Sequence, residues 1–372
     1  MHTRQKKFGI IGGGQLARML ALKCHQIGYQ AYILSGSATD PAAQVTKFWV
    51  EGDVHDIGTL KSFLENVDFA TFESEFLDAE KLKLASQFSK KSLYPAPQIM
   101  GRLQNRNSQK MLLDEMGISV VPWIFVEHQH QAEEVLASLK TDMILKKCRF
   151  GYDGYGTFVI HSQSQLAAIF EKPFADAYIA EAKIKFRREL AFMMARDQFG
   201  NIVSLPLVES HQNDSKCLWI KGPVSHPGFN KLQGQFKKFL KKLNYVGIMG
   251  IELFDCGKEL LVNELAPRVH NSGHYSLDAF THDQFLLHIM AVAGLKFPKQ
   301  NDSKSKAFAM YNLIGDTWNP NWSNQNLHYH WYGKEEARPG RKMGHITALA
   351  SLPDSALNKI LKCGHLKTAE KK

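Results

Sequence analysis

Several features that mark large classes of proteins are missing from this chain of 372 residues. No apolar run approaches the roughly 18 residues that a membrane span requires, so we expect no association with a membrane. The N-terminal segment lacks the apolar core and cleavage site of a signal peptide. The five cysteines are odd in number, widely spaced and without a C-x-x-C pair. They predict reduced thiols in a cytoplasmic protein, with neither a disulfide framework nor a zinc site.

Positive charge is in excess but is not concentrated. The formal net charge is +10, yet the Lys and Arg residues are spread along the chain and belong to no recognisable nucleic-acid-binding module. The densest run, Lys237-Lys238 with Lys241-Lys242, has the i, i+4 spacing of one exposed helix face. We therefore expect no nucleic-acid partner, whereas small anionic substrates would benefit from the positive field.

The chain is too long for one hydrophobic core, which predicts about two or three domains. Over roughly the first ninety residues, short apolar strands alternate with amphipathic helices, a pattern that predicts a parallel sheet flanked by helices. The expected elements are strands at Lys7–Ile11, Gln30–Leu34, Phe48–Val50 and Asp68–Phe72, with helices at Gln15–Ile27 and Asp56–Asn66. The proline-containing break Tyr94-Pro95-Ala96-Pro97 indicates the first domain boundary.

The rest of the chain mixes strands and helices. Helices are expected at Ser108–Met116 and Asp283–Ala293, and strands at Trp123–Val126, Met143–Lys147, Ala177–Glu181, Glu189–Ala195, Val203–Val208, Ala307–Leu313, Leu327–Trp331 and His345–Leu349. A polar linker at Lys299–Lys306 separates a small third region. The expected domains are therefore residues 1–95, 96–298 and 299–372.

A glycine turn, Gly12-Gly13-Gly14-Gln15, follows the first strand and opens a helix, where backbone N–H groups can bind an anion. The second strand ends in Leu34-Ser35-Gly36 and offers no acid to hold the ribose of a dinucleotide. A site for a smaller phosphate, with Ser35 as a donor, fits better than a dehydrogenase. The alternative interpretation is a tight turn that binds no ligand.

A second glycine loop spans Gly151 to Gly156 and lies five residues after Lys146, at the end of an apolar strand. Alternate glycines allow a flap to fold over phosphates, and Lys146 can supply a point charge. The G-K-[ST] ending of a Walker A loop is absent. A surface turn without a ligand is about as compatible with these residues.

The most informative stretch is an expected β-hairpin that turns at Asp255-Cys256-Gly257-Lys258 and carries Glu252 and Glu264 on its two strands. Carboxylates on a rigid sheet suit Mg²⁺, which takes one or two protein oxygens and fills its shell with water and phosphate. A loop with cationic, imidazole and amide groups follows at once, and it holds Arg268, His270, Asn271 and His274. Such groups suit an anion under chemical attack. A charged hairpin with a polar loop is the less favoured alternative.

Between loop and hairpin lies the segment Glu181-Ala182-Lys183-Ile184, followed by Glu189. Its extended backbone can hydrogen-bond adenine, and Glu189 can reach ribose hydroxyls. Together, the strand lysine, glycine flap, extended hinge and two acidic strands resemble the ATP-grasp superfamily. GGGQLARMLA, TFESE at Thr71–Glu75, GYDGYG, NELAPRVHNSGH and EARPGRKMGHIT at Glu336–Thr347 narrow the resemblance to the N5-carboxyaminoimidazole ribonucleotide synthases of purine biosynthesis, in order from about Phe8 to Thr347.

The resemblance implies an ATP-grasp fold of mixed α/β and α+β class. It would have a Rossmann-like N-terminal domain with a parallel sheet and a small, β-rich C-terminal domain. The implied reaction uses ATP, bicarbonate and 5-aminoimidazole ribonucleotide to form the N5-carbamate, ADP and phosphate. Mg²⁺, as two ions, is the implied metal, and a homodimer is the implied assembly.

The resemblance also implies roles for individual residues. ATP would be held by Arg106, Lys146, Gly151, Tyr152, Asp153, Gly154, Tyr155, Gly156, Thr157, Glu181, Ala182, Lys183, Ile184, Glu189, Gln212, Asn263 and Glu264. Mg²⁺ would bind Glu252 and Glu264. The aminoimidazole ribonucleotide would contact Gln15, Ser35, Glu73, Tyr152, Asp153, Lys334 and Arg341. Arg268, His270 and Asn271 would lie at the bicarbonate or carboxyphosphate position and act in catalysis together with Lys146.

Three positions depart from the family pattern. Gln212 stands where many relatives have a histidine near the nucleotide, and Tyr155 stands where a basic flap residue is common. Ala266 lies two residues after the second metal glutamate, where many ATP-grasp enzymes have an asparagine. These departures keep two alternatives open. One is another ATP-grasp ligase, of the formate-dependent transformylase or biotin carboxylase type. The other is a nucleotide-binding regulatory protein without turnover.

Overall fold

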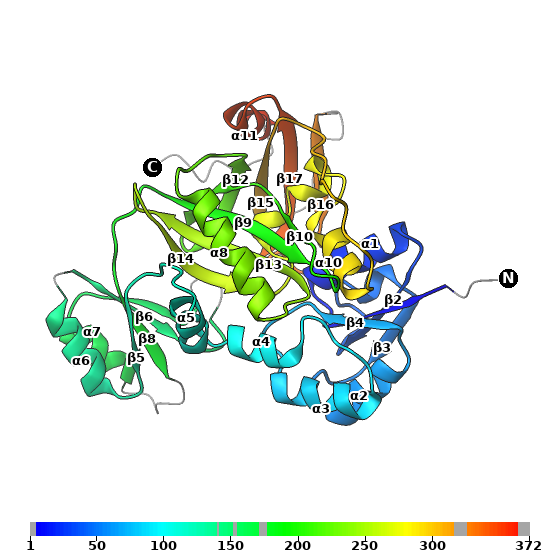
Figure 1. The fold of residues 1–372 in the computed structure, drawn as a ribbon, viewed down its shortest axis with the longest axis horizontal. Helices are drawn as coiled ribbons and strands as arrows, with labels where there is room; N and C mark the ends of the chain where they lie inside the picture. The colour runs from blue at the N-terminus through cyan, green and yellow to red at the C-terminus, as the bar shows by residue number, and fades with distance from the viewer. Residues whose placement is uncertain (1–4, 140, 152–154, 171–176, 316–325, 364–372) are drawn as a thin grey trace.

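The computed structural model describes residues 5–139, 141–151, 155–170, 177–315 and 326–363. The N-terminal part is a parallel sheet of β1 (Lys7–Ile11), β2 (Gln30–Ser35), β3 (Phe48–Glu51) and β4 (Phe69–Phe72), in the order β3-β2-β1-β4. Apolar residues of α1 (Gln15–Gln26) pack on one face, and those of α2 (Ile57–Glu65) and α3 (Ala79–Ser89) on the other (Figure 1). The strand–helix alternation in the sequence thus becomes the expected parallel sheet with helices on both faces.

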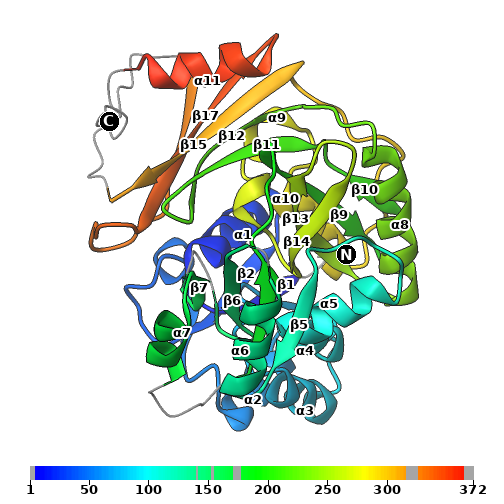
Figure 2. The same cartoon turned by 90° about the vertical axis from the view of Figure 1, so that its left-hand side faces the viewer.

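A second, four-stranded antiparallel sheet follows. Its strands are β5 (Trp123–Val126), β8 (Tyr178–Ala182), β6 (Met143–Lys147) and β7 (Thr157–Ile160), in that order. Apolar residues of α6 (Gln129–Ser138) and α7 (Gln163–Phe170) form its small core. Helices α4 (Pro97–Leu103) and α5 (Arg106–Asp114) connect this sheet to the first one, and α5 contacts β8 (Figure 2).

The largest sheet is antiparallel and runs in the order β14-β13-β9-β11-β12-β15-β17-β16, with β10 also paired to β9. Its strands are β9 (Arg188–Arg196), β10 (Ile202–Ser204), β11 (Val208–Asn213), β12 (Lys216–Gly222), β13 (Gly247–Asp255), β14 (Leu260–Ala266), β15 (Ala307–Ile314), β16 (Leu327–Trp331) and β17 (Lys342–Ala350). Because β12 pairs with β15, the three C-terminal strands continue the central sheet. Helix α11 (Pro353–Leu361) packs against β15 and β17.

One expected strand is wrong. The sequence predicts a single strand over Val203–Val208, whereas the structure has β10 and β11 separated by Leu205, Pro206 and Leu207. Both strands pair with β9, but Pro206 has no N–H to donate to the ladder. The proline therefore divides an apolar run that otherwise has strand character.

Alternate residues of β9 face two different helices. Leu190, Phe192 and Met194 lie in the core with α8 (Phe229–Lys242), and Ala191, Met193 and Ala195 in the core with α10 (Gln284–Val292). The lysines of the dense run on α8 are exposed, as the sequence predicts. Shorter segments are η1 (Ala43–Val45), η2 (Asn271–Gly273) and α9 (Ser276–Ala279). No helix of the described ranges is long and apolar enough to cross a bilayer.

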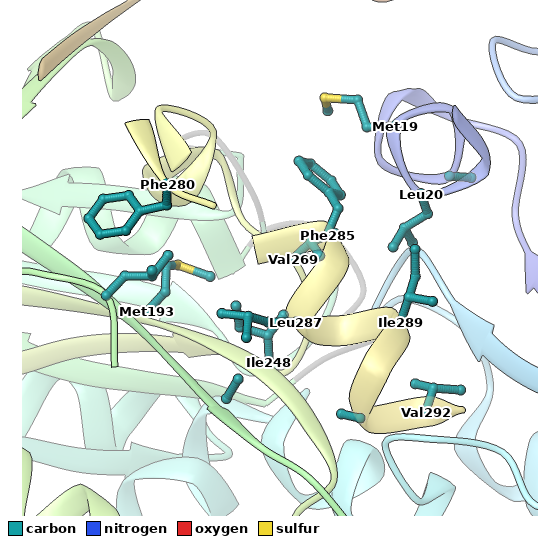
Figure 3. Close-up of a cluster of buried hydrophobic side chains, with 14 of the residues drawn as sticks. Met19, Leu20, Met193, Ile248, Val269, Phe280, Phe285, Leu287, Ile289 and Val292 are labelled. Atoms are coloured by element: carbon teal, nitrogen blue, oxygen red, sulfur yellow. The ribbon is translucent and has the colours of Figure 1, made fainter. Parts of the chain in front are cut away.

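Helix α10 joins the N-terminal part to the large sheet. Figure 3 shows it between α1, which carries Met19 and Leu20, and the strand that carries Ile248. Phe285, Leu287 and Ile289 of α10 are fully buried in this shared core. The first sheet and the large sheet are thus fixed to one another, and residues from both can form one site.

Candidate functional site

The two glutamates of the hairpin face one another directly. Strands β13 and β14 pair antiparallel, and Glu252 lies opposite Glu264 in the register. The register shifts immediately afterwards, because Leu253 pairs with Val262 and Asn263 is left as an extra residue. A β-bulge of this kind re-aims neighbouring side chains, so Asn263 and Glu264 can both reach groups of the site.

Arg106 connects Glu264 to the start of the glycine flap. Its Nη2 lies 3.2 Å from each carboxylate oxygen of Glu264, and its guanidinium also donates to the carbonyls of Lys147 and Gly151. A Cβ at position 151 would lie 2.4 Å from Arg106 Nη1, so a larger residue there would displace this guanidinium group. Of the remaining flap, Gly156 has a φ of 74° and Thr157 begins β7.

Among the other predicted flap residues, the side chain of Tyr155 is exposed. The predicted ligands Tyr152, Asp153 and Gly154 lie outside the described residues.

Lys146 of β6 lies at the centre of a chain of charges. Its Nζ is 2.7 Å from Glu181 Oε2 and 3.1 Å from Asn263 Oδ1. The other oxygen of Glu181, Oε1, is 2.6 Å from Nζ of Lys110, and the side chains of both Lys110 and Glu181 are only 2% exposed. Burial raises the pKa of Glu181, but the two lysines outweigh burial and hold that pKa below its usual value. The carboxylate is therefore charged and engaged on both oxygens.

The hinge and the ribose-side residues lie beside this chain. Strand β8 ends at Ala182, and the Lys183 N–H beyond it donates to the Asp142 carbonyl at 2.9 Å. Lys183 Nζ bonds Asp142 Oδ2 at 2.9 Å near the surface. Glu189 at the start of β9 accepts a hydrogen bond from Gln212, and burial raises the pKa of Glu189. The residue that replaces the family histidine therefore does lie next to the predicted ribose ligand.

The loop after the hairpin is held by two side chains from elsewhere. Arg268 forms a two-pronged ion pair with Glu75, with Nη2 2.7 Å from Oε1. Gln284 of α10 accepts from the His270 N–H at 2.8 Å, donates to the His270 carbonyl at 2.9 Å, and bonds His274 Nδ1 at 2.7 Å. The loop conformation is thus fixed from the N-terminal part and from α10 together.

His270 is neutral and has a defined tautomer. Its Nδ1 accepts from the Ser272 N–H at 3.3 Å, so the proton belongs on Nε2, which lies 3.8 Å from Glu252 Oε1. Burial, followed by the charges of Arg268 and Lys342, holds the pKa of His270 well below its usual value. His274 is 1% exposed, and burial likewise lowers its pKa. A neutral imidazole with an Nε2–H can donate to an anion without needing a low pH.

The side-chain amide of Asn271, the third predicted catalytic residue of this loop, pairs with that of Asn312. Its Nδ2 donates to Asn312 Oδ1 at 2.9 Å, and Asn312 Nδ2 donates back to Asn271 Oδ1 at 2.8 Å. Asn312 on β15 is fully buried and also donates to the Cys217 carbonyl at 2.9 Å. The pair fastens the loop to the C-terminal strands.

The glycine turn near the N-terminus is shaped around Glu73. Glu73 accepts from the Gly14 N–H at 2.5 Å and from the Ala17 N–H at 3.0 Å, so its carboxylate lies at the N-terminus of α1. A Cβ on Gly12 would lie 2.6 Å from Glu73 Cγ. Burial raises the pKa of Glu73. Gln15 begins α1 beside it, and the buried Ser35 accepts from Trp49 Nε1 at 3.1 Å.

The C-terminal residues predicted to bind the ribonucleotide come from the loop between β16 and β17. The carbonyl of Gly333 accepts from Gln44 Nε2 at 2.7 Å, so this loop lies against the N-terminal part. Lys334 follows at once, and its Nζ donates to the Lys342 carbonyl at 2.7 Å. Arg341 donates to the Glu336 carbonyl within the same loop at 3.0 Å.

A narrow cleft marks where these parts meet. It is lined by Glu75 and Phe76 of the N-terminal part, Arg106 of α5, Phe150 and Gly151 of the flap, and Glu264 of the hairpin. Arg106 and Glu264, which the sequence suggests as ligands from distant stretches of the chain, therefore border one opening together with Glu75.

Sequence reasoning missed Lys110, Glu75 and Gln284. Lys110 lies four residues after Arg106 on the same helix face, which is a weak signal that was present. Glu75 is part of the TFESE motif, but nothing local indicates that it pairs with an arginine 193 residues away. Gln284 at the start of an apolar helix gave no signal.

Together, the flap, the hinge and the paired acidic strands define an ATP-grasp protein. Three family models match in order: the Ribonucleotide synthetase preATP-grasp domain at residues 5–104, the ATP-grasp domain at 111–285, and the Phosphoribosylaminoimidazole carboxylase C-terminal domain at 309–359. The N5-carboxyaminoimidazole ribonucleotide synthase of Synechococcus elongatus is 34% identical, covering 91% of this chain and 88% of that protein. The Bacillus subtilis relative of the same name is 33% identical, covering 95% and 93%.

This chain belongs to the N5-carboxyaminoimidazole ribonucleotide synthase family. Solved structures of similarly named proteins have the same fold. The Staphylococcus aureus N5-carboxyaminoimidazole synthetase complexed with ADP superposes with a TM-score of 0.89 at 29% identity, covering 96% of both chains. The Aspergillus clavatus synthase in complex with ADP and 5-aminoimidazole ribonucleotide gives a TM-score of 0.85 at 28% identity, also over 96% of both chains. The expected fold class is confirmed.

Proposed function

We propose that this chain carboxylates 5-aminoimidazole ribonucleotide at its amine, using ATP and bicarbonate and releasing ADP and phosphate, in purine biosynthesis. The observation that carries the proposal is the convergence of the family's motifs on one cleft. Glu264 pairs with Arg106 beside the flap, and Glu75, which pairs with Arg268, lines the same cleft. A bicarbonate-activating reaction needs both a nucleotide and an anion pocket beside it.

The nucleotide would lie between the flap and the hairpin. Lys146 would neutralise phosphate charge, the hinge backbone from Glu181 to Ile184 would bind the adenine edge, and Glu189 would accept from ribose hydroxyls. Gln212 supports this arrangement, because it positions the Glu189 carboxylate without adding a charge. The substitution of the family histidine is thus compatible with ATP binding.

The hairpin carboxylates fit Mg²⁺. Glu252 and Glu264 are opposed in register, their side chains are 29% and 38% exposed, and hard oxygen donors with room for water are what this ion selects. When bound, Mg²⁺ would offset the charge of the phosphate oxygens. Ala266 is buried and stands where many ATP-grasp enzymes have an asparagine, so Glu252 and Glu264 are the metal ligands of the hairpin in this proposal.

The carbon pocket would be formed by Arg268 and His270. The guanidinium fork of Arg268 is paired with Glu75, so Arg268 would act on bicarbonate through its positive charge. His270 donates from Nε2 rather than acting as a base, since its Nδ1 already accepts from Ser272. A bicarbonate oxygen attacks the γ-phosphorus and ADP leaves. The substrate amine then bonds to the carbon of carboxyphosphate, or of the CO₂ it releases, while phosphate departs and the amine loses a proton. Gln15, Ser35, Glu73, Lys334 and Arg341, with Tyr152 and Asp153, would hold the ribonucleotide.

Two broader properties belong to this proposal. A homodimer is expected by analogy with the family, and light scattering on the purified chain tests it. A cytoplasmic location is expected from the cysteines, all five of which are free thiols in the structure. Fractionation of cells that express the chain tests the location.

The test of the activity is an assay of ADP release with 5-aminoimidazole ribonucleotide and bicarbonate each omitted in turn. We expect ADP release to depend on both. Release that needs neither, or that formate or biotin supports instead, would overturn the assignment. ATP binding without any substrate-dependent ADP release would favour the regulatory alternative.

A further inference from the structure

The buried ammonium of Lys110 has no role in the reaction described so far. Lys110 lies on α5, which also provides Arg106 one turn earlier. The two cations point to acids on different sheets, because Arg106 pairs with Glu264 of β14 and Lys110 with Glu181 of β8. Burial lowers the pKa of Lys110, which means that the protonated form depends on its acidic neighbours.

We propose that Lys110 is a positioning residue that balances the charge of Glu181, so that Lys146 keeps a net positive charge for the nucleotide phosphates. This inference rests on the proposed ATP site. The carboxylate is divided between the two ammonium groups, with Oε1 at 2.6 Å from Lys110 and Oε2 at 2.7 Å from Lys146. Two lysines and one glutamate carry a net charge of +1. Without Lys110, the Lys146–Glu181 pair would be neutral.

Exposure separates the roles of the two lysines. The side chain of Lys110 is 2% exposed, whereas that of Lys146 is 14% exposed and also bonds Asn263 on the hairpin. Of the two lysines, Lys146 is therefore the one whose ammonium group a ligand can reach. Lys110 contacts Glu181 in the interior, where little water screens its charge, so that charge has a strong effect on its neighbours.

The experiment is displacement of a fluorescent nucleotide, trinitrophenyl-ATP, by ADP and by adenosine. We expect Lys110→Met to weaken ADP binding by about tenfold or more, since a like-sized apolar side chain removes the balancing charge. Adenosine, which carries no phosphate, should change by about twofold or less. A purely structural role in shaping the hinge would weaken both ligands equally, and that result would overturn the proposal.

A double-mutant cycle tests whether Lys110 acts through Glu181. In a Glu181→Gln background the two lysines carry +2, and adding Lys110→Met returns the net charge to the +1 of the wild type, so the double variant should bind ADP far more tightly than Lys110→Met alone. A double variant that binds ADP as weakly as Lys110→Met alone would contradict the mechanism. Comparison of the double variant with the wild type decides the matter if Lys110→Met alone fails to show a cooperative thermal transition.

The matched control is Lys237→Met, at an exposed lysine of α8. It should leave both affinities as in the wild type. If the wild-type chain itself binds no ADP, the proposed function fails. If it binds ADP and Lys110→Met binds equally well, only this inference fails.

Discussion

The three carboxylates around the nucleotide position differ in their partners. Glu181 is buried and has a lysine on each oxygen. Glu264 is 38% exposed and is opposed by the single cation Arg106, and Glu252 lies 3.8 Å from a neutral histidine. A carboxylate with two buried ammonium partners has little left to offer an ion, whereas the two hairpin glutamates are partly exposed.

Glu264→Gln should therefore lower turnover by about 100-fold or more while the fold is retained, because an amide keeps the shape but loses the charge that holds a divalent cation. Steady-state ADP release at saturating Mg²⁺ measures the change, and circular dichroism checks the fold. Glu259→Gln, at an exposed position of the same hairpin, is the control. Near-normal turnover of Glu264→Gln would remove the metal role.

Arg341 and Arg338 offer a matched pair for the ribonucleotide. Both lie in the loop before β17, but Arg338 is 69% exposed and pairs with Glu336. Arg341→Ala should raise the KM for 5-aminoimidazole ribonucleotide by about tenfold, with the KM for ATP changed by about twofold or less, because a charge-assisted bond to one substrate is lost. Arg338→Ala should change neither constant. Equal effects of Arg341→Ala on both substrates would argue against a phosphate contact.

At the scale of elements, the hairpin shows what sequence can predict. Its two strands and its turn follow from strand-forming and turn residues, but the direct pairing of Glu252 with Glu264 does not, because an unbroken register from Leu253–Val262 would place Asn263 opposite Glu252. The bulge at Asn263 does not follow, since an extra residue in one strand is set by how the neighbouring strand and Lys146 fit. The motifs that suggest site residues can be read from the sequence because each motif is local in it.

Partners brought from other elements could not be predicted. Glu75 reaches Arg268, and Gln284 reaches His270, only because α10 and the N-terminal sheet pack against the large sheet. Pro206 gives a contrasting case, since the signal against a continuous strand was present in the sequence and was outweighed by the apolar run. The contacts of Glu75 and Gln284 depend on tertiary packing, whereas the break at Pro206 depends on local stereochemistry.

Strand β13 leaves space for the loop that carries His270. A Cβ on Gly250 would lie 2.8 Å from Cβ of His270, so Gly250→Ala must displace the imidazole. We expect kcat/KM for bicarbonate to fall by about tenfold or more, and the free energy of unfolding by about 1–3 kcal/mol. Gly234→Ala on α8 is the control, because nothing lies within 4 Å of the added atom. It should stabilise that helix by about 1 kcal/mol and leave the kinetics unchanged. An unchanged kcat/KM for Gly250→Ala would show that the loop adapts.

At the scale of the whole molecule, one histidine of α10 joins two sheets. His288 Nδ1 accepts from the Ile248 N–H of β13 at 3.2 Å, and its Nε2 bonds Thr71 Oγ1 of β4 at 2.7 Å. Both nitrogens are used by the neutral ring, so protonation of Nδ1 would break the bond to β13. Burial lowers the pKa of His288 from 6.5 to about 3.

Stability should therefore fall in mild acid. The unfolded chain takes up the proton below about pH 6.5 and the folded chain does not, so the contribution of His288 is complete above that pH and is lost as the pH falls toward the folded pKa. At about pH 5 this one residue costs about 2 kcal/mol, and the lowered pKa values of His270, His274 and His345 act in the same direction. Urea unfolding at about pH 7.5 and pH 5 measures the loss. His288→Gln, which can still bond but cannot titrate here, should lose about 2 kcal/mol less than the wild type, whereas exposed His25→Gln should match the wild type. An identical pH dependence in His288→Gln would show that acid acts elsewhere than at the joint between the two sheets.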